Sequence, residues 1–589
     1  MARALLYGTA VSPGYAIGRV HLLHVAGMIE KRRIAPRQVA RERRRLRAAS
    51  EAVREALREA MGKVPDDLAE YREVIAAQME LARDPKLLES AEKKIESDLI
   101  CASWALDETV NQLCALFAKM EDPYLRDRAQ DIRAVGLRLR ERLQGARTAV
   151  LPDDGCVLMA EDLSPADVMD MDFSGVQALV TAQGGPTSHT AILARGLRIP
   201  ALVGLPDVLA TVREGDSVIV DGVGGILLAG PEHDDLARYS ALREAYTAWE
   251  TRVRAAAHWP ADTRDGVRVS VQANMERPGE APEMRESGAD GVGLYRTEFS
   301  FLRETLPEEK DLLEEYGAVV RGVASARVVF RTLDVGADKM MRAQAGVREP
   351  NPALGLRGIR FCLRHRHLFR TQLRALMRVG VMGNVALMLP MISTLDEVLA
   401  VRGIMRDLHG ELAARRIPHA ESLPLGVMIE TPAAVLIADA LARECDFFSI
   451  GTNDLIHYLL AIDRNNHQVA YLNEALHPAV VRSLKRVIDA AHREGIGVSV
   501  CGELASDPYG LALLLGMGVD AVSASPRFVP GMKHMLRRLE AATCMDLAYN
   551  VLMSADISAS QRMVRERLQE LLGSELAFHT TSILTHSHE

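Results

Sequence analysis

The chain has 589 residues, of which 48% are hydrophobic and 25% are charged, a composition typical of folded globular domains. Lys and Arg number 71 and Asp and Glu number 79, a formal net charge of −8, so bulk charge does not predict binding to nucleic acid or to a membrane. Aromatic residues make up only 4% of the chain, which argues against a stacking surface for single-stranded nucleic acid. The length predicts about three to five domains.

No apolar run approaches the ~20 residues that a membrane-spanning helix needs. Gly and Pro interrupt the N-terminal segment, where a signal peptide needs a continuous apolar stretch. The seven cysteines are scattered without a CxxC pair, a pattern typical of reduced thiols. We therefore expect a cytoplasmic protein that binds neither membrane nor nucleic acid.

The N-terminal part of the sequence reads as one α/β domain, residues 1–27 and 146–230, interrupted by a helical insertion. Short apolar runs separated by Gly, Pro and Asp predict strands at residues 156–160, 178–182, 201–204 and 217–221. The intervening segment contains almost no Gly, and Leu46, Val53 and Leu57 recur at helical spacing. We therefore expect residues 28–145 to form an α-helical subdomain inserted into the α/β domain.

A second and larger domain is predicted at residues 263–575, after a polar linker helix and hinge at 231–262. Eight apolar runs alternate there with helix-like sequence, at residues 267–274, 291–295, 328–333, 386–391, 424–430, 447–451, 497–501 and 521–525. This count and length fit a TIM (β/α)8 barrel, with a doubly wound open sheet as the alternative. Residues 576–589 are expected to form a frayed tail.

Chemically active side chains gather at the carboxyl ends of these predicted strands, where TIM barrels build their active sites. They are Arg296, Arg331, Asp334, Asp338, Lys339, Arg357, Glu430, Asn453, Asp454, Arg464 and Cys501. Arginine binds phosphate and carboxylate through a planar two-pronged fork, so the set predicts a site for a small substrate that carries both groups. Glu430 and Asp454 are hard oxygen ligands on adjacent strands and suit Mg²⁺. Taken singly, each arginine could instead form a surface ion pair, and Cys501 could fill the barrel end as a small apolar residue.

A histidine in the α/β domain stands at the predicted start of a helix. Residues 183–196 read QGGPTSHTAILARG, and His189 follows two glycines that permit unusual backbone angles. Thr187 or Ser188 can cap the helix, whose free N–H groups would stabilise an anion carried on the imidazole. The alternative is an ordinary surface histidine in a Gly-rich loop.

The two sites together resemble those of the phosphoenolpyruvate-utilising enzymes. The stretch GGPTSHTAILARG is similar to the phosphohistidine signature of that family, and GVMIETPAAV, FFSIGTNDLIHYLLAIDRNN and VCGELASD are similar to its second signature. Further matches are SPGYAIGRV, DPYLRDRAQDIRAVGLRL, GVGLYRTEFSFL and FRTLDVGADK. Because these motifs span nearly the whole chain in order, the sequence is identified as a member of this family, most similar to the protein phosphotransferases of the sugar phosphotransferase system.

The resemblance implies a role for each candidate residue. His189 would attack the phosphorus of phosphoenolpyruvate and carry the phosphoryl group, with Thr187 supporting its ring. Cys501 would protonate the departing enolpyruvate to give pyruvate. The substrate would be held by Arg296, Arg331, Arg357, Asn453, Asp454 and Arg464, and Mg²⁺ by Glu430 and Asp454. In such a reaction the protein contributes mainly positioning and electrostatic stabilisation.

The resemblance also implies partners and a motion. The phosphoryl group would pass to a histidine of HPr, a small carrier protein that docks on the helical subdomain. The α/β domain that carries His189 would swivel between the barrel and the carrier, with residues 231–262 as the hinge. Relatives dimerise through the barrel domain, so a homodimer is expected.

Some residues depart from the family's pattern. Pro186 stands where many sugar-system enzymes have Arg or Lys, and Gln78 stands where His is expected, with Arg83 in a region expected to be acidic. Residues 31–60 hold 11 Lys or Arg against four Asp or Glu, for which a solvated helix face is the simplest explanation. These departures raise the alternative of a regulatory phosphoprotein that senses phosphoenolpyruvate and feeds a divergent carrier.

Pyruvate phosphate dikinase and phosphoenolpyruvate synthase are a further alternative, because they share both signatures. These enzymes need a large nucleotide-binding domain. The chain has no GxxxxGK[ST] loop, and the segment before the predicted His189 strands is mostly helical. We therefore expect no nucleotide-dependent reaction.

Overall fold

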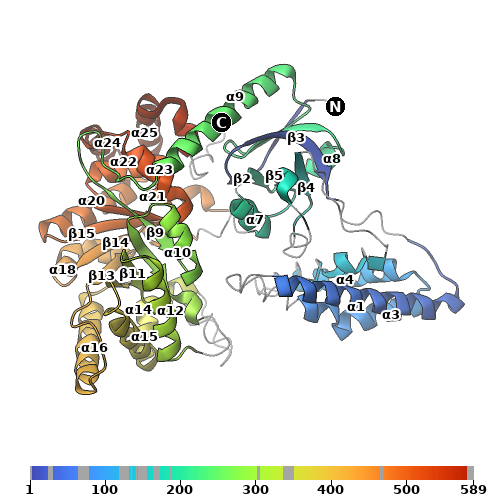
Figure 1. Cartoon of the computed structure of the whole chain (residues 1–589), viewed down its shortest axis with the longest axis horizontal. Helices are drawn as coiled ribbons and strands as arrows, with labels where there is room; N and C mark the ends of the chain where they lie inside the picture. The colour runs from blue at the N-terminus through green and yellow to red at the C-terminus, as the bar shows by residue number, and fades with distance from the viewer. Residues whose placement is uncertain are drawn as a thin grey trace. The chain divides into compact units, whose positions relative to one another are not determined.

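The computed structural model describes residues 3–23, 31–63, 78–118, 132–133, 135–140, 142–143, 155–163, 171, 173–185, 188–197, 199–301, 306–335, 351–463, 466 and 468–579. The chain divides into two compact units, Met1–Thr247 and Ala248–Glu589, whose elements are labelled in Figure 1. Each unit has its own hydrophobic cores.

The N-terminal unit contains an eight-stranded sheet that joins the first residues of the chain to a later segment. The strands are β1 (Ala4–Tyr7), β2 (Thr9–Ser12), β3 (Tyr15–Leu22), β4 (Cys156–Ala160), β5 (Val176–Thr181), β6 (Ala201–Val203), β7 (Ser217–Asp221) and β8 (Ile226–Ala229). Their order is β1-β8-β7-β3-β4-β5-β6-β2. Strands β3 to β6 run parallel, and the remaining neighbours are antiparallel. The predicted α/β character of this region is therefore confirmed.

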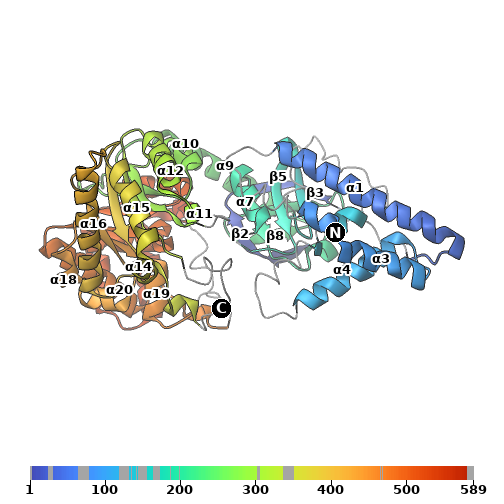
Figure 2. The same ribbon diagram turned by 90° about the horizontal axis from the view of Figure 1, so that it is seen from below.

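The alternation of side chains in β4 explains how the sheet is covered. Val157 and Leu158 point into different cores, as the two-residue period of a strand requires. Helix α7 (His189–Leu197) contributes to the core of Leu158 and contacts β2, β5 and β6, and Figure 2 shows it beside the sheet. Helix α8 (Val208–Thr211) contributes to the core of Val157.

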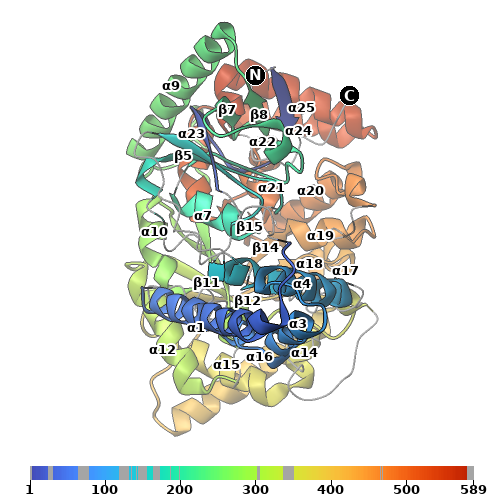
Figure 3. The same cartoon turned by 90° about the vertical axis from the view of Figure 1, so that its right-hand side faces the viewer.

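The inserted helices form a core of their own. Helices α1 (Val39–Lys63), α3 (Pro85–Ser97) and α4 (Ala102–Ala118) contact one another and lie together in Figures 1 and 3. The residues that set the predicted helical period, Leu46, Val53 and Leu57, are buried in this core. The helical character predicted for the insertion is therefore confirmed.

The excess of arginine in α1 is partly balanced within the helical region. Glu92 of α3 is buried and accepts hydrogen bonds from Arg43 at 2.7 Å and from Arg47 at 2.5 Å. Glu42 is also buried and pairs with Arg45 at 3.0 Å. The expected solvated face is therefore only part of the explanation, because several basic residues tie α1 to α3.

The division between the two units falls inside one continuous helix, α9 (His233–Ala255). In the N-terminal unit, Tyr239 of this helix is buried, with its ring centroid 6.1 Å from that of Tyr15. In the C-terminal unit, Trp249 is buried. The helix predicted at 231–262 is thus a single element with one buried aromatic anchor in each unit.

The first residues of the expected tail are packed against this helix. Helix α26 (Leu576–His579) places Phe578 5.7 Å and His579 5.0 Å from the ring of Trp249, measured between ring centroids. The expectation of a frayed tail from residue 576 is therefore wrong for these four residues, because aromatic burial holds them in place. Residues 580–589 lie outside the described residues.

The C-terminal unit is built on a closed barrel of eight parallel strands. They are β9 (Ser270–Met275), β10 (Gly291–Arg296), β11 (Arg327–Arg331), β12 (Val385–Leu389), β13 (Leu425–Ile429), β14 (Phe447–Gly451), β15 (Gly497–Cys501) and β16 (Ala521–Ala524). Each strand pairs in parallel with the next, and β16 closes on β9. The predicted TIM barrel is therefore confirmed, and the open sheet is excluded.

Helices surround the barrel, as the outer labels of Figure 1 show. They are α10 (Ala281–Glu286), α11 (Glu298–Phe301), α12 (Glu309–Gly322), α14 (Gly358–Arg364), α15 (Arg366–Val379), α16 (Leu395–Ala414), α17 (Pro432–Leu436), α18 (Ala438–Ala442), α19 (Thr452–Leu459), α20 (Pro478–Arg493), α21 (Glu503–Ser506), α22 (Pro508–Met517), α23 (Val529–Leu536), α24 (Ala541–Met553) and α25 (Ile557–Leu572). Strand side chains such as Phe448 and Ile450 join these helices in one large core. Among the described helices, none combines the length and the apolar character that crossing a membrane requires.

Helices α22 and α24 approach so closely that a glycine is needed between them. A Cβ on Gly516 would lie 2.0 Å from the carbonyl oxygen of Cys544, so we expect Gly516→Ala to lower the free energy of unfolding of the barrel by about 1–3 kcal/mol. The control is Gly410→Ala in α16, where nothing lies within 4 Å and where alanine favours the helix. Urea unfolding of both variants tests this, and equal stability of the two would contradict the close packing.

Candidate functional site

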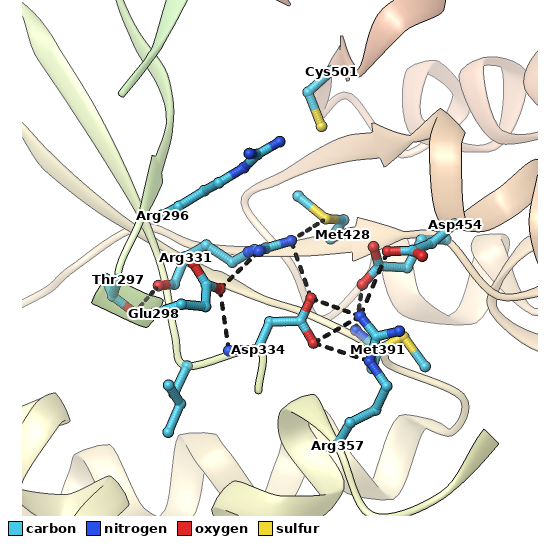
Figure 4. A network of polar contacts seen from close by, with 12 residues as sticks. Arg296, Thr297, Glu298, Arg331, Asp334, Arg357, Met391, Met428, Asp454 and Cys501 are labelled. Atoms are coloured by element: carbon cyan, nitrogen blue, oxygen red, sulfur yellow. Dashed lines mark hydrogen bonds and ion pairs between the residues drawn. The ribbon is translucent and has the colours of Figure 1, made fainter. Parts of the chain in front are cut away.

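The carboxyl ends of five barrel strands bring most of the predicted residues together. Arg296 ends β10, Arg331 ends β11 and Cys501 ends β15, while Glu430 directly follows β13. Asp454 lies in the first turn of α19, which follows β14. Figure 4 shows the side chains of Arg296, Arg331, Asp454 and Cys501 around one region at this end of the barrel. The sequence-based prediction that they share a site is in accord with this arrangement.

Arg331 is the most deeply placed cation of the site, with only 9% of its surface exposed. One guanidinium nitrogen donates to Glu298 at 2.7 Å, and the other lies 3.2 Å from Asp334. Burial acts to lower the pKa of this guanidinium, but the two carboxylates outweigh it and hold the pKa above its usual range. Its buried Nε has no hydrogen-bond partner among the described residues, so a donor is left over for a ligand.

Asp334 joins this arginine to a second one. Its carboxylate accepts two hydrogen bonds from one nitrogen of Arg357, at 3.2 and 3.1 Å, and its backbone N–H donates to Glu298 at 3.2 Å. Burial alone would raise the pKa of the Asp334 carboxyl, but Arg331 and Arg357 outweigh burial and lower it. Asp334 is therefore the charged bridge that holds the two arginines together, as the dashed lines of Figure 4 show.

Arg357 reaches this position from the residue before α14. It donates to the hydroxyl of Tyr458 at 3.1 Å and lies 3.6 Å from Asp454. Burial would lower its pKa, yet Asp334 and Asp454 raise the pKa of this guanidinium above its ordinary value. Arg357 thus stays charged while it links the loop after β11 to α19.

Glu430 is almost completely buried, with 1% of its surface exposed. One carboxylate oxygen accepts a hydrogen bond of 2.6 Å from the backbone N–H of Met391. Burial is the main cause that raises the pKa of Glu430 to about 8, and the nearby charges of Asp334 and Asp454 act in the same direction. A Cβ on Gly451 would lie 2.9 Å from the other carboxylate oxygen, so the glycine leaves this oxygen room.

The chemistry of these carboxylates fits a divalent cation. The pKa of Glu430 is raised first by burial and then by the charges of Asp334 and Asp454, and a hard cation beside these carboxylates would relieve their repulsion. No group of three or more His, Cys, Asp or Glu side chains within the described ranges is arranged to enclose a metal ion. The set therefore suits Mg²⁺, which usually takes one or two protein carboxylates and completes its shell with water and substrate oxygens.

Cys501 lies inside the barrel at the end of β15 and is 3% exposed. Its thiol donates to the carbonyl of Ile450 at 3.5 Å, and its sulfur accepts from the Ser449 hydroxyl at 3.6 Å. Burial raises the pKa of this thiol, so the sulfur retains its proton at neutral pH. In Figure 4 the sulfur of Cys501 points toward the region that the arginines occupy.

Arg296 and Asn453 lie nearer the surface of the site. The Arg296 side chain is 41% exposed and pairs with Glu276 at 2.6 Å. Asn453 accepts a hydrogen bond of 3.2 Å from the backbone N–H of Glu503, which fixes the loop after Cys501. That loop begins at Gly502, whose φ of +107° belongs to the region that glycine favours.

Five of the predicted residues have side chains outside the described part of the structure. Thr187 and Arg464 lie outside the described residues, and for His189 the structure describes the backbone but not the side chain. His189 is the first residue of α7, and Ser188 caps this helix by accepting from the N–H of Ala191 at 3.3 Å. The predicted histidine at a helix start is therefore confirmed, with Ser188 as a cap.

Asp338 and Lys339 also lie outside the described ranges. The site contains supporting residues that the sequence analysis missed, namely Glu276, Glu298, Gln372 and Tyr458. Glu298 follows Arg296 by two residues, so its place beside a strand end was a usable signal. No sequence pattern identifies Gln372 as a site residue, because it lies in a helix whose alternation of polar and apolar residues is ordinary.

Gln372 of α15 is a buried polar hub behind the site. Its carbonyl oxygen accepts from the N–H of Leu333 at 3.1 Å, and its amide donates to Thr297 at 3.0 Å. Thr297 in turn donates to the carbonyl of Arg331 at 2.9 Å. These bonds tie the ends of β10 and β11 together, so the arginines that end both strands are held in register.

Comparison with known proteins supports the same region as a functional site. Three parts of the chain match family models of phosphoenolpyruvate-utilising enzymes: residues 7–128 the N-terminal domain, 152–225 the mobile domain and 250–541 the phosphoenolpyruvate-binding domain. The barrel site lies within the third match.

Curated relatives are similar over most of this chain. The phosphoenolpyruvate-protein phosphotransferase of Bacillus sp. (strain S) is 39% identical over 540 residues, 91% of this chain and 93% of the relative. The proteins of the same name from Geobacillus stearothermophilus and Listeria monocytogenes are 40% identical over 540 residues and 38% identical over 551 residues. These matches cover 91% and 93% of this chain, and 93% and 96% of the relatives.

The buried carboxyl of Glu430 predicts a pH dependence of stability in metal-free buffer. Its pKa is raised from 4.5 to about 8, so between these values the folded state keeps a proton that the unfolded chain has lost. The free energy of unfolding is therefore not reduced by this group below about pH 4.5. It declines as the pH rises toward 8, by at most about 1.4 kcal/mol per pH unit. Glu430→Gln should lose this dependence, and parallel pH profiles of unfolding free energy for the two proteins would contradict it.

Proposed function

Because the chain belongs to the phosphoenolpyruvate-protein phosphotransferase family, we propose that its His189 accepts the phosphoryl group of phosphoenolpyruvate at the barrel site. The chain is an enzyme that transfers this group to a protein. The observation that carries the assignment of the site is the buried pair of arginines, Arg331 and Arg357, held by Asp334 at the carboxyl end of the barrel.

The reaction exchanges one phosphorus bond for another. A nitrogen of the His189 imidazole forms a bond to phosphorus, the bond from phosphorus to the enol oxygen breaks, and the electron pair leaves with the enolate of pyruvate. Cys501 then gives its thiol proton to the methylene carbon of the enolate, which yields pyruvate. The high pKa of the Cys501 thiol supports this role, because the group holds its proton until a stronger base is beside it.

The fixed arginines supply the electrostatic part of catalysis. Arg331 and Arg357 are oriented before any substrate binds, since Asp334 and Glu298 already hold their guanidinium groups. Preorganised charges of this kind stabilise the developing negative charge without reorganising during the reaction. The unpartnered Nε of Arg331 and the half-exposed guanidinium of Arg296 are the donors that remain for the phosphate.

The remaining predicted contacts complete the substrate site. We assign Asn453 to the substrate carboxylate, because its amide N–H₂ is a donor beside the loop that follows Cys501. Arg464 and Thr187 keep the roles that the family resemblance implies, as a phosphate ligand and a support of His189. Glu430 and Asp454 would hold Mg²⁺, which when bound would neutralise charge on the phosphate and carboxylate oxygens.

The acceptor that we propose is a histidine of an HPr-type carrier docked on the helical subdomain, as part of a sugar phosphotransferase system. The sequence departures that pointed to a divergent carrier are weak. Gln78 is only 2% exposed, and Arg83, which is exposed, pairs with Glu80 three residues before it. The regulatory sensor of phosphoenolpyruvate is not favoured, because curated relatives that match most of the chain are named phosphoenolpyruvate-protein phosphotransferases.

We further propose that the enzyme is a cytoplasmic homodimer that joins through the barrel and swivels at α9. The support for the swivel is that His189 belongs to one compact unit and the barrel site to the other, with the division inside α9. Domain motion about such a connecting element would let one histidine serve two sites. The dimer and the cytoplasmic location rest on the family resemblance.

The first test is labelling with phosphoenolpyruvate that carries ³²P in its phosphate, in the presence of Mg²⁺. We expect acid-labile, base-stable label on the wild-type protein and none on His189→Ala, because a phosphoramidate forms only on that ring. His233→Ala, at the exposed start of α9, is the control and should label normally. Label on His189→Ala would overturn the assignment of the nucleophile.

A second test concerns the metal. Glu430→Gln and Asp454→Asn should each raise the Mg²⁺ concentration for half-maximal labelling at least about tenfold, because each loses an anionic ligand. Asp439→Asn, on the exposed side of α18, controls for removal of a nearby negative charge. A Mg²⁺ titration that is the same for all four proteins would remove these two residues from the metal site.

A further inference from the structure

Ser449 is a polar residue inside the apolar interior of the barrel. It lies in β14 two residues after Phe447, which belongs to the interior cluster with Cys501, so both side chains point inward. The register pairs Gly451 with Cys501 on the neighbouring strand, which places Ser449 one layer below the thiol. Ser449 is 1% exposed, and the cluster around it is otherwise formed by Leu294, Val329, Ala386, Met388 and Met428.

The hydroxyl of Ser449 is directed at the sulfur of Cys501. It donates to that sulfur at 3.6 Å, while the thiol itself donates to the carbonyl of Ile450. Burying a hydroxyl among apolar side chains is costly unless the hydroxyl has a good partner, and a neutral thiol is a weak acceptor. An alanine here would avoid that cost, so the apolar surroundings alone give no reason for a hydroxyl.

The hydrogen bond from Ser449 to Cys501 becomes stronger when the sulfur is negatively charged. Hydrogen bonds to ionised acceptors are about twice as strong as those between neutral groups. An interaction that strengthens as the reaction proceeds favours catalysis, whereas one of constant strength does not. The position of Ser449 therefore has its greatest effect at the moment when Cys501 has lost its proton.

We propose that Ser449 is a positioning residue that orients the Cys501 thiol and stabilises the thiolate left when that thiol protonates enolpyruvate. The inference rests on the proposed role of Cys501. In the step, the S–H bond breaks, a C–H bond forms at the methylene carbon, and the electron pair stays on sulfur. The enolate thereby becomes pyruvate, and the negative charge that it carried moves to the sulfur.

Other groups that act on the sulfur come from three further strands. Burial is the chief cause of the raised pKa of Cys501, and Glu430 after β13 adds to it. Arg331 at the end of β11 and Arg296 at the end of β10 lower the pKa of this thiol, as does the Ser449 bond. Ser449 therefore works in the same direction as the arginines, but by direct contact from the strand beside Cys501.

The test compares Ser449→Ala with Ser499→Ala. Ser499 is the Cα partner of Ser449 on β15, and its hydroxyl donates to the carbonyl of Phe448 rather than to Cys501. The readouts are the single-turnover rates of ³²P labelling of His189 and of pyruvate formation, each measured as a function of pH with full-length protein and Mg²⁺. Cys501→Ala is measured beside them.

We expect Ser449→Ala to label His189 at the wild-type rate but to form pyruvate about tenfold more slowly, the cost of losing one hydrogen bond to a charged group. In this variant the alkaline limb of the pH profile for pyruvate formation should move to higher pH, because the Cys501 thiolate without this donor is less stable and the pKa of the thiol rises. Ser499→Ala should match the wild type. Ser449→Thr, which keeps the hydroxyl, should retain the wild-type alkaline limb even if its extra methyl lowers the rate.

The outcomes distinguish the proposed role of Cys501 from the proposed role of Ser449. If Cys501→Ala forms pyruvate at the wild-type rate, the proposed proton donor is wrong and the inference falls with it. If Cys501→Ala is slow but Ser449→Ala behaves like Ser499→Ala, only the role of Ser449 is overturned. An equal shift of the alkaline limb in Ser449→Ala and Ser449→Thr would also overturn it, since the effect would then follow packing and not the hydroxyl.

Discussion

The site depends on one buried carboxylate. Asp334 lies between Arg331 and Arg357 and holds both guanidinium groups at the carboxyl end of the barrel. Burying an arginine is costly, and removing one partner of a buried ion pair leaves an uncompensated charge at a cost of about 3–5 kcal/mol. Asp334 is the partner that the two buried cations share, beside Glu298 for Arg331 and Asp454 for Arg357, and the other site residues are arranged around this fixed pair.

That arrangement leaves a charge imbalance that explains the chemistry of the site. Among the described residues, three guanidinium groups, those of Arg296, Arg331 and Arg357, face five carboxyl groups, those of Glu276, Glu298, Asp334, Glu430 and Asp454. Among these groups negative charge exceeds positive charge; Lys339 and Arg464 lie outside the described residues and are not counted. The raised pKa of Glu430 partly relieves this excess, and a divalent cation would relieve it further. The imbalance is thus the physical argument for proposing a metal beside the arginines.

The sequence predicts positions along strands better than contacts between them. All eight barrel strands and the start of α7 lie where apolar runs and a capping serine predict them, because these features depend on residues close together in the chain. The pairing of Asp334 with Arg357 joins residues 23 apart, a separation at which no local pattern reveals the contact. The sequence pattern predicts Gln372 to be a surface polar residue of a helix, yet it is 1% exposed, because it packs against Thr297 and Leu333, which follow the ends of β10 and β11.

The division of the chemistry between two units has a further consequence. The acid, the arginines and the carboxylates belong to one rigid barrel, whereas His189 belongs to a separate unit. The barrel and the sheet that leads to the histidine have separate hydrophobic cores. Within the barrel, Cys501, Ser449 and Glu430 act on one another directly or through charge. Changes to the proton donor and to the phosphate site are therefore coupled.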